Sequence, residues 1–161
     1  MRLHDTRGFI LAEQLVSIVF IGLLCIAVAA GLAAALTAYQ GITKQTDAQQ
    51  VLARTIDEVN GELAYARSSD GTQFTSSTTN TVVQLVNVEG GIALRRAGSS
   101  SDPEVLVGTS KGLWPEFEVG PTYDSDTNAW SYTVVVRDSG MVDVLRQEMK
   151  VTQVNSAASS G

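Results

Sequence analysis

The first long pattern in the chain is an uninterrupted run of uncharged, mostly apolar residues. Residues 14–43 contain no Asp, Glu, Lys, Arg or His. About twenty apolar residues in a helix cross a hydrocarbon layer of about 30 Å, because each residue adds about 1.5 Å. The run is therefore long enough to form a single membrane-spanning helix.

A second helical pattern follows where charged residues return. Apolar residues recur there at spacings of four, four, three, four and three, namely Ala48, Leu52, Ile56, Val59, Leu63 and Ala66. Such spacing places them on one face of a helix, with the charged residues mostly on the other side. We therefore predict one helix from about Ile10 to Arg67, whose part over residues 44–67 is amphipathic and packs on another element.

The rest of the chain reads as short strands separated by turns. Residues 81–89 and 92–96 predict a hairpin about Gly90-Gly91, and residues 104–108 predict a short strand. Residues 130–138 and 141–154 predict a second hairpin about Ser139-Gly140. A helix followed by antiparallel strands belongs to the α+β class, so residues 68–155 are expected to form a small antiparallel β-sheet domain. Residues 156–161 are expected to form a disordered tail.

Composition narrows the functional classes. The chain has 161 residues, with 11 basic and 17 acidic side chains and a net charge of −6. Nucleic-acid binding is not expected, because neutralising phosphates requires a basic surface. The single cysteine, Cys25, lies within the apolar run and cannot form a disulfide inside one chain.

Charges on either side of the run indicate its orientation. Arg2 and Arg7 precede it, and Asp5 offsets only one of them. The excess of basic residues predicts an N-terminus in the cytoplasm and the bulk of the chain outside the membrane. An ordinary secretory signal peptide is the alternative, because the Ala-rich residues 27–38 could supply a cleavage site. The run is long for that role, and an acid at Glu13 would be unusual in it.

The residues around the start of the run resemble a known family. The stretch "GFILAEQLVSIVFIGLL" resembles the N-terminus of type IV prepilins and pseudopilins, in which a short basic leader ends in Gly and is followed by Phe, three residues, Glu and an apolar helix. Here these positions are Gly8, Phe9 and Glu13. The resemblance covers about residues 1–35. The chain departs from it at Gln14, where an apolar residue is common, and in lacking the helix-kinking Pro of many pilins.

The resemblance implies a fold and a processing step. It implies one long N-terminal helix, membrane-spanning in its first half, packed on a small antiparallel sheet. It also implies that a prepilin peptidase/methyltransferase cuts between Gly8 and Phe9 and then methylates the new amino group of Phe9. The leader is then Met1–Gly8, and residues 9–43 form the transmembrane and filament-core helix. Cleavage would also remove His4, the only histidine.

Glu13 is the expected assembly contact. A carboxylate in a membrane segment is costly, and such residues are usually paired and functional. The family picture pairs it with the methylated amine of Phe9 in a neighbouring subunit, so that only correctly staggered helices satisfy both charges. Solvation of Glu13 at headgroup level is the simpler alternative.

Other chemistry is weakly represented in the sequence. Asp124, Asp126 and Asn128 alternate as in a calcium loop, but Ala129 and Val135 stand where an EF-hand needs Gly and Glu. An irregular calcium site and a plain polar turn both stay open there. The sequence offers no nucleophile–base pair, phosphate loop or metal cluster, so no enzyme activity, cofactor or other metal is expected.

The expected function is that of a pilin-like subunit, more specifically a minor pilin or pseudopilin, in a type IV pilus, competence or type II secretion filament. The expected partners are other such subunits, the prepilin peptidase, the inner-membrane assembly platform and the membrane itself. The expected location is the cytoplasmic membrane in a single pass, and later an extracytoplasmic filament. The alternative is a secreted or single-helix-anchored extracellular β-domain that binds a ligand and does not polymerise.

Overall fold

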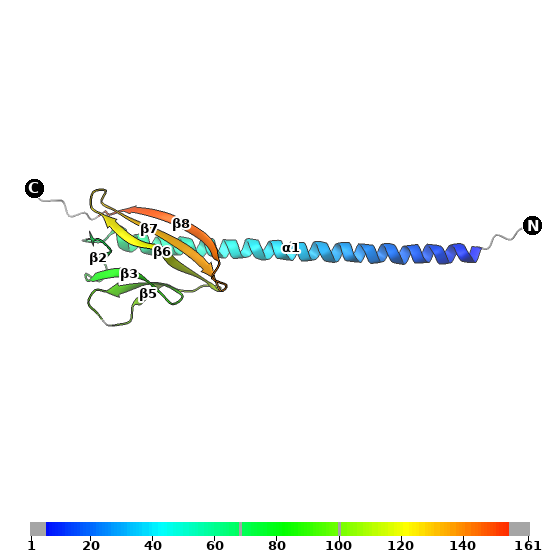
Figure 1. Ribbon diagram of the computed structural model, residues 1–161, viewed down its shortest axis with the longest axis horizontal. Helices are drawn as coiled ribbons and strands as arrows, with labels where there is room; N and C mark the ends of the chain where they lie inside the picture. The colour runs from blue at the N-terminus through cyan, green and yellow to red at the C-terminus, as the bar shows by residue number, and fades with distance from the viewer. Residues whose placement is uncertain (1–5, 68, 100, 155–161) are drawn as a thin grey trace, which may run out of the picture. The chain divides into compact units, whose positions relative to one another are not determined.

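The chain has the α+β architecture expected from its sequence. The computed structural model describes residues 6–67, 69–99 and 101–154, with side chains described from Leu11 onward. Within these residues one long helix, α1 (Thr6–Ala64), precedes eight antiparallel strands (Figure 1). The chain divides into two compact units, Met1–Thr43 and Lys44–Gly161. The expected leader residues 1–5 and tail residues 156–161 lie outside the described residues.

In the first unit, the described residues are helical and have no protein packed around them. Every described side chain from residue 11 to residue 43 is exposed. By length and composition, α1 is apolar enough to cross a membrane. Two hydroxyls near the end of this unit are satisfied inside the helix, because Thr37 and Thr43 donate to the carbonyls of Ala33 and Tyr39, each at 3.0 Å.

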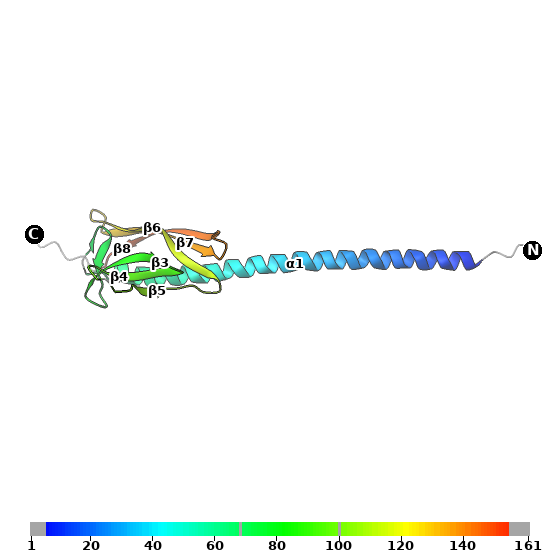
Figure 2. The same cartoon turned by 60° about the horizontal axis from the view of Figure 1, so that its bottom comes forward.

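The second unit contains two antiparallel sheets, whereas the sequence predicted one (Figure 2). The first sheet has the order β1-β2-β3-β4-β5, and the second has the order β6-β7-β8. The strand bounds are β1 (Ser69–Asp70), β2 (Gln73–Thr75), β3 (Val82–Val88), β4 (Gly91–Arg96), β5 (Glu104–Val107), β6 (Leu113–Asp124), β7 (Ala129–Asp138) and β8 (Asp143–Thr152).

Both predicted hairpins are confirmed. Strand β3 pairs with β4 in a register that places Val88 opposite Gly91, so the turn lies at Glu89-Gly90. Strand β7 pairs with β8 through a loop of residues 139–142, which is longer than the two-residue turn expected at Ser139-Gly140. The helix ends at Ala64 instead of Arg67, because the chain there turns into the first sheet and the Arg67 amide donates to the Thr75 carbonyl at 2.9 Å.

Strand β6 was not predicted, and its position in the sheet explains why it forms. It contains Pro115 and Pro121, which cannot donate to a ladder and argue against a central strand. In the fold β6 is an edge strand that pairs only with β7, so one side of its backbone needs no strand partner. On that free side, the Asn87 side chain takes the place of a strand partner at Phe117. It donates to the Phe117 carbonyl at 2.9 Å and accepts from the Phe117 amide at 2.8 Å. The Asn87 side chain joins the two sheets.

The core of the second unit lies between the amphipathic part of α1 and both sheets. Its main cluster contains Val59, Leu63 and Ala66 at the end of the helix and its turn, and Phe74, Val83, Leu85, Ile92, Phe117, Trp130, Tyr132, Val134 and Val151 from the strands. Aromatic rings meet edge to face in it, with centroids 5.7 Å apart for Phe74 and Trp130 and 5.8 Å apart for Phe117 and Tyr132. Trp130 is therefore a core residue.

The buried face of the helix is slightly rotated from the predicted one. Val51 and Thr55 are buried, whereas the predicted Leu52 and Ile56 are only partly buried at the margin. A threonine was not expected at a core position. Its hydroxyl is satisfied within the helix, because it donates to the Val51 carbonyl at 2.7 Å, and its methyl group is left to pack.

We predict that Tyr132→Phe destabilises the second unit by about 1–2 kcal/mol, because it leaves the side-chain oxygen of Asn60 without its donor. The Tyr132 hydroxyl, which is nearly inaccessible to solvent, donates to Asn60 Oδ1 at 2.6 Å. Chemical denaturation of the full chain in detergent micelles measures the effect. Ser131→Ala, at an exposed neighbouring position, is the control and should change stability by less than about 0.5 kcal/mol. Equal stabilities of the two variants would contradict the prediction.

Candidate functional site

The candidate assembly site lies at the start of α1. The backbone is helical from Thr6, so positions 9 and 13 lie one turn apart on the same face. The side chain of Phe9 lies outside the described residues, and so does the structure of residues 1–5 in the expected leader. The backbone at the predicted cleavage and methylation positions, Gly8 and Phe9, is helical.

Glu13 is the only charged residue among the described side chains of the first unit. It lines a shallow hollow on the helix surface together with Gln14, Ser17 and Ile18. Among the described residues, none of the polar groups of Glu13, Gln14 and Ser17 has a hydrogen-bond or ion-pair partner. The hydroxyls of Thr37 and Thr43 differ in this respect, because the helix itself accepts their protons. Any partner for the polar groups of Glu13, Gln14 and Ser17 must come from residues outside the described ones or from another molecule.

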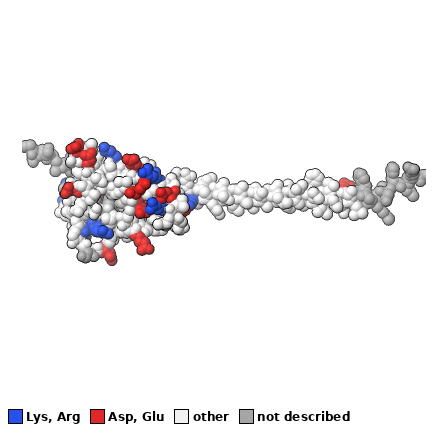
Figure 3. Space-filling view, in the orientation of Figure 1, with Lys and Arg blue, Asp and Glu red and all other residues white. Residues whose placement is uncertain are grey.

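The two units differ in their content of charged side chains. Figure 3 shows acidic and basic side chains on the strand-bearing unit, whereas the visible face of the described N-terminal helix is almost entirely uncharged. An acid at Glu13 therefore stands without a compensating cation on the described part of its own unit. In an apolar medium such a carboxylate must be paired, hydrated or protonated.

The predicted calcium residues form a turn between β6 and β7. The Asp124 carboxylate accepts from the Asp126 amide at 2.9 Å and from the Thr127 hydroxyl at 2.8 Å. These bonds, the Thr127 hydroxyl first, lower the pKa of Asp124. The side-chain oxygen of Asn128 accepts from the Tyr123 hydroxyl at 2.6 Å, and its amide donates to the Gln153 carbonyl at 3.1 Å. Asp124 and Asn128 thus use their oxygens to hold the turn.

No metal cluster is present in the part of the chain that the structure describes, where no three His, Cys, Asp or Glu side chains are grouped so that they could hold an ion. Calcium binding at Asp124, Asp126 and Asn128 stays an untested prediction, and the geometry gives the first and last of these residues a structural role.

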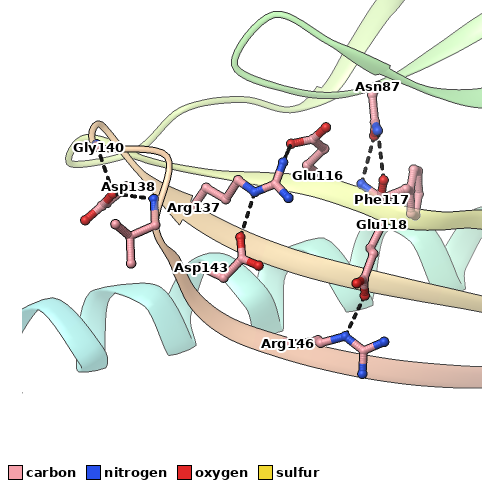
Figure 4. A network of polar contacts seen from close by, with 10 residues as sticks. Asn87, Glu116, Phe117, Glu118, Arg137, Asp138, Gly140, Asp143 and Arg146 are labelled. Atoms are coloured by element: carbon pink, nitrogen blue, oxygen red, sulfur yellow. Dashed lines mark hydrogen bonds and ion pairs between the residues drawn. The ribbon is translucent and has the colours of Figure 1, made fainter.

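The loop between β7 and β8 is the feature that sequence reasoning missed. The Asp138 carboxylate accepts from the amides of Gly140 and Val142 at 2.9 and 3.0 Å (Figure 4). Its other oxygen pairs with Lys44. The sequence predicted only a turn at this place. The signal that could have revealed the loop is Asp138 itself, because an Asp side chain at a turn commonly accepts from the backbone amide two residues on, here that of Gly140.

Beside this loop, charged side chains are paired on the outer face of the second sheet (Figure 4). Arg137 donates to Asp143 at 2.7 Å and to Glu116 at 2.5 Å, and Arg146 donates to Glu118 at 2.5 Å. The Asp143 carboxylate, followed by Glu116, raises the pKa of Arg137. Val135 is fully buried between them in register, opposite Glu116 on one side and Arg146 on the other.

Comparison of the chain with protein-family models, with curated proteins and with solved structures finds no match.

We predict that Asp138→Asn lowers the thermal midpoint at about pH 7 and has little effect at about pH 2. The Lys44 ammonium, followed by the loop amides, holds the pKa of Asp138 below its ordinary value of 3.8. A carboxyl whose pKa is lower in the folded state stabilises the fold above its unfolded pKa. That stabilisation is lost as the pH falls through the folded pKa. Thermal unfolding of the full chain in detergent measures the difference.

Asp126→Asn is the matched control, because it removes the same charge from an exposed position in another turn. A loss for Asp138→Asn of the same size at both pH values would contradict the electrostatic origin of the effect.

Proposed function

We propose that the chain is a pilin-like subunit, of the minor-pilin or pseudopilin kind, of a type IV filament system. The observation that carries the proposal is Glu13, an acid without a described partner near the start of a helix long and apolar enough to span a membrane. The Gly8-Phe9 pair in front of it supports the same proposal, as does an α+β fold in which the same helix continues into an amphipathic part packed on strands.

In this proposal the chain is the substrate of an enzyme and is not an enzyme itself. A prepilin peptidase cuts the peptide bond after Gly8 on the cytoplasmic side and methylates the new amino group of Phe9. The product is a helix that begins with a cation at position 9 and carries an anion at Glu13. The membrane holds this subunit in a single pass until an inner-membrane assembly platform moves it into a filament.

The two charges select the stagger between neighbouring helices. A buried ion that loses its partner costs about 3–5 kcal/mol. When the amine of one subunit reaches Glu13 of the next, both charges are satisfied, and other staggers leave both unpaired in apolar surroundings. Small residues allow the helix backbones to approach closely enough for this contact, among them Gly22, Ala27, Ala30, Gly31 and Ala34.

The first test is the mass of the membrane-bound form. We predict that the intact chain purified from its native membrane lacks Met1–Gly8 and carries one added methyl group at the amine of Phe9. Top-down mass spectrometry measures both changes. A start within about residues 30–40 would instead identify an ordinary secretory signal peptide and the alternative function, a β-domain that binds a ligand and does not polymerise.

The second test concerns assembly. We predict that Glu13→Leu is inserted and trimmed normally but is lost from filaments, because the amine of the neighbouring subunit then lacks its counter-ion. Pull-down of sheared filaments, followed by quantification of this subunit, measures incorporation. Gln14→Leu is the matched control, since it replaces the adjacent polar side chain without removing a charge, and it should be incorporated at the parent level. Incorporation of Glu13→Leu at that level would contradict the proposal.

A further inference from the structure

Two large apolar side chains are exposed on the loop between β7 and β8. Met141 has an exposed fraction of 70% and Val142 one of 58%. Met141 also has a backbone φ of +60°, in the left-handed region that side chains rarely adopt. A glycine there would be free of this strain, so the loop keeps an exposed methionine at a position that does not favour one.

Asp138 fixes the conformation of this loop. Its side chain accepts from the amides of Gly140 and Val142 (Figure 4). Its carbonyl accepts from the Met141 amide at 2.9 Å. The Asp138 amide donates to the Val142 carbonyl at 3.1 Å and closes the loop. Four hydrogen bonds thus hold a short loop whose apolar side chains point away from the core. Backbone strain that surrounding contacts hold in place, as at Met141, is typical of functional sites.

Lys44 links the loop to the end of the charge-free run of residues 14–43. Its ammonium pairs with the second oxygen of Asp138. Lys44 is also the first charged residue after the charge-free residues 14–43. When a helix spans a membrane, the first lysine after the apolar run lies at the level of the headgroups, because its charge stays in water. A loop bound to that lysine therefore lies at the same level.

Among the described residues, the other cations near the loop are already paired with carboxylates. Lys111 pairs with Asp47 at 2.5 Å, and Arg137 pairs with Glu116 and Asp143. Apolar side chains therefore offer the main attraction to a lipid surface, and no preference for anionic lipid is expected. Met141 lines an open hollow with Val88 and the partly buried Trp114; Glu89, Gly90, Thr109 and Glu116 complete its lining. Tryptophan is favoured at the membrane interface, where its ring is apolar and its N–H stays hydrated.

We propose that Met141 and Val142 insert into the lipid–water interface of the membrane that α1 spans. The ligand of this loop is thus a lipid surface. The contact holds the second unit at the bilayer surface. The inference rests on the membrane span alone, and neither leader cleavage nor filament assembly is required for it.

The test uses the full chain in phosphatidylcholine vesicles with an environment-sensitive fluorophore. Met141→Cys in a Cys25→Ser background carries the label at the loop. Val154→Cys in the same background is the matched control, because Val154 is also apolar and 66% exposed. Its amide donates to the Ala64 carbonyl, about 30 Å along the helix from Lys44. Lipids brominated along their acyl chains should quench the label at position 141 severalfold more than the label at position 154.

A label on the native Cys25 separates the membrane span from the loop contact. Strong quenching at Cys25 with equal quenching at positions 141 and 154 would overturn the loop inference and leave the span intact. Absence of quenching at Cys25 would overturn both. Self-quenching of the label at position 141 that rises with protein density, without quenching by lipid, would identify a second copy as the occupant and would also overturn the inference.

A label-free measurement guards against misfolding of the labelled variants. In the unlabelled chain, brominated lipid should quench part of the tryptophan emission, because Trp114 lines the hollow beside Met141 whereas Trp130 is buried. Met141→Asp should reduce that quenching, while the near-ultraviolet circular dichroism of the core aromatics stays unchanged. Undiminished quenching in Met141→Asp would count against insertion of the loop.

Discussion

The burial of one helix face against two sheets is the interaction on which the second unit depends. Between Ala48 and Ala66, the same side of the chain repeatedly supplies buried side chains to the core. Each large apolar side chain that leaves water contributes about 1.5–3 kcal/mol, so this contact outweighs the surface ion pairs around it. The N-terminal part of the same helix has no such cover, because its described side chains are exposed all around. One helix thus has two different parts: its C-terminal part is buried on one face in a protein core, and its N-terminal part is apolar enough to span a membrane.

Much of the fold could be predicted from the sequence, because period and turn chemistry are local signals. The hairpin at Glu89-Gly90 and the pairing of β7 with β8 followed from alternating apolar residues around glycine-containing turns. Strand β6 could not be predicted in this way, since Pro115 and Pro121 are acceptable only at a sheet edge, and an edge is a property of the whole fold. The division into two sheets was missed for the same reason: Asn87 joins them through a contact between positions thirty residues apart.

For the candidate assembly site, the sequence contributes more than the geometry. Gly8, Phe9 and Glu13 are suggested by the order of residues in the sequence, and the described geometry adds that Glu13 has no partner on the described part of its own chain. The partner of Glu13 could not be predicted from geometry, because the described side chains of its unit include no cation. The Met141 loop shows a further limit: the sequence gives a hairpin, but the bond between Lys44 and Asp138, ninety-four positions apart, is what connects that hairpin to the end of the apolar run.

The last described residues close the end of the helix. Gln153 donates to the Ala66 carbonyl at 2.7 Å and accepts from the Ser69 hydroxyl at 3.0 Å, and the Val154 amide donates to the Ala64 carbonyl at 2.7 Å. The carbonyls at the end of a helix have no partners within it, so these bonds act as a cap supplied from almost ninety residues downstream. A ribosome makes the helix well before these capping residues. The second unit therefore completes its fold only after the chain has been made as far as Val154, and a product truncated before Gln153 would keep an open helix end.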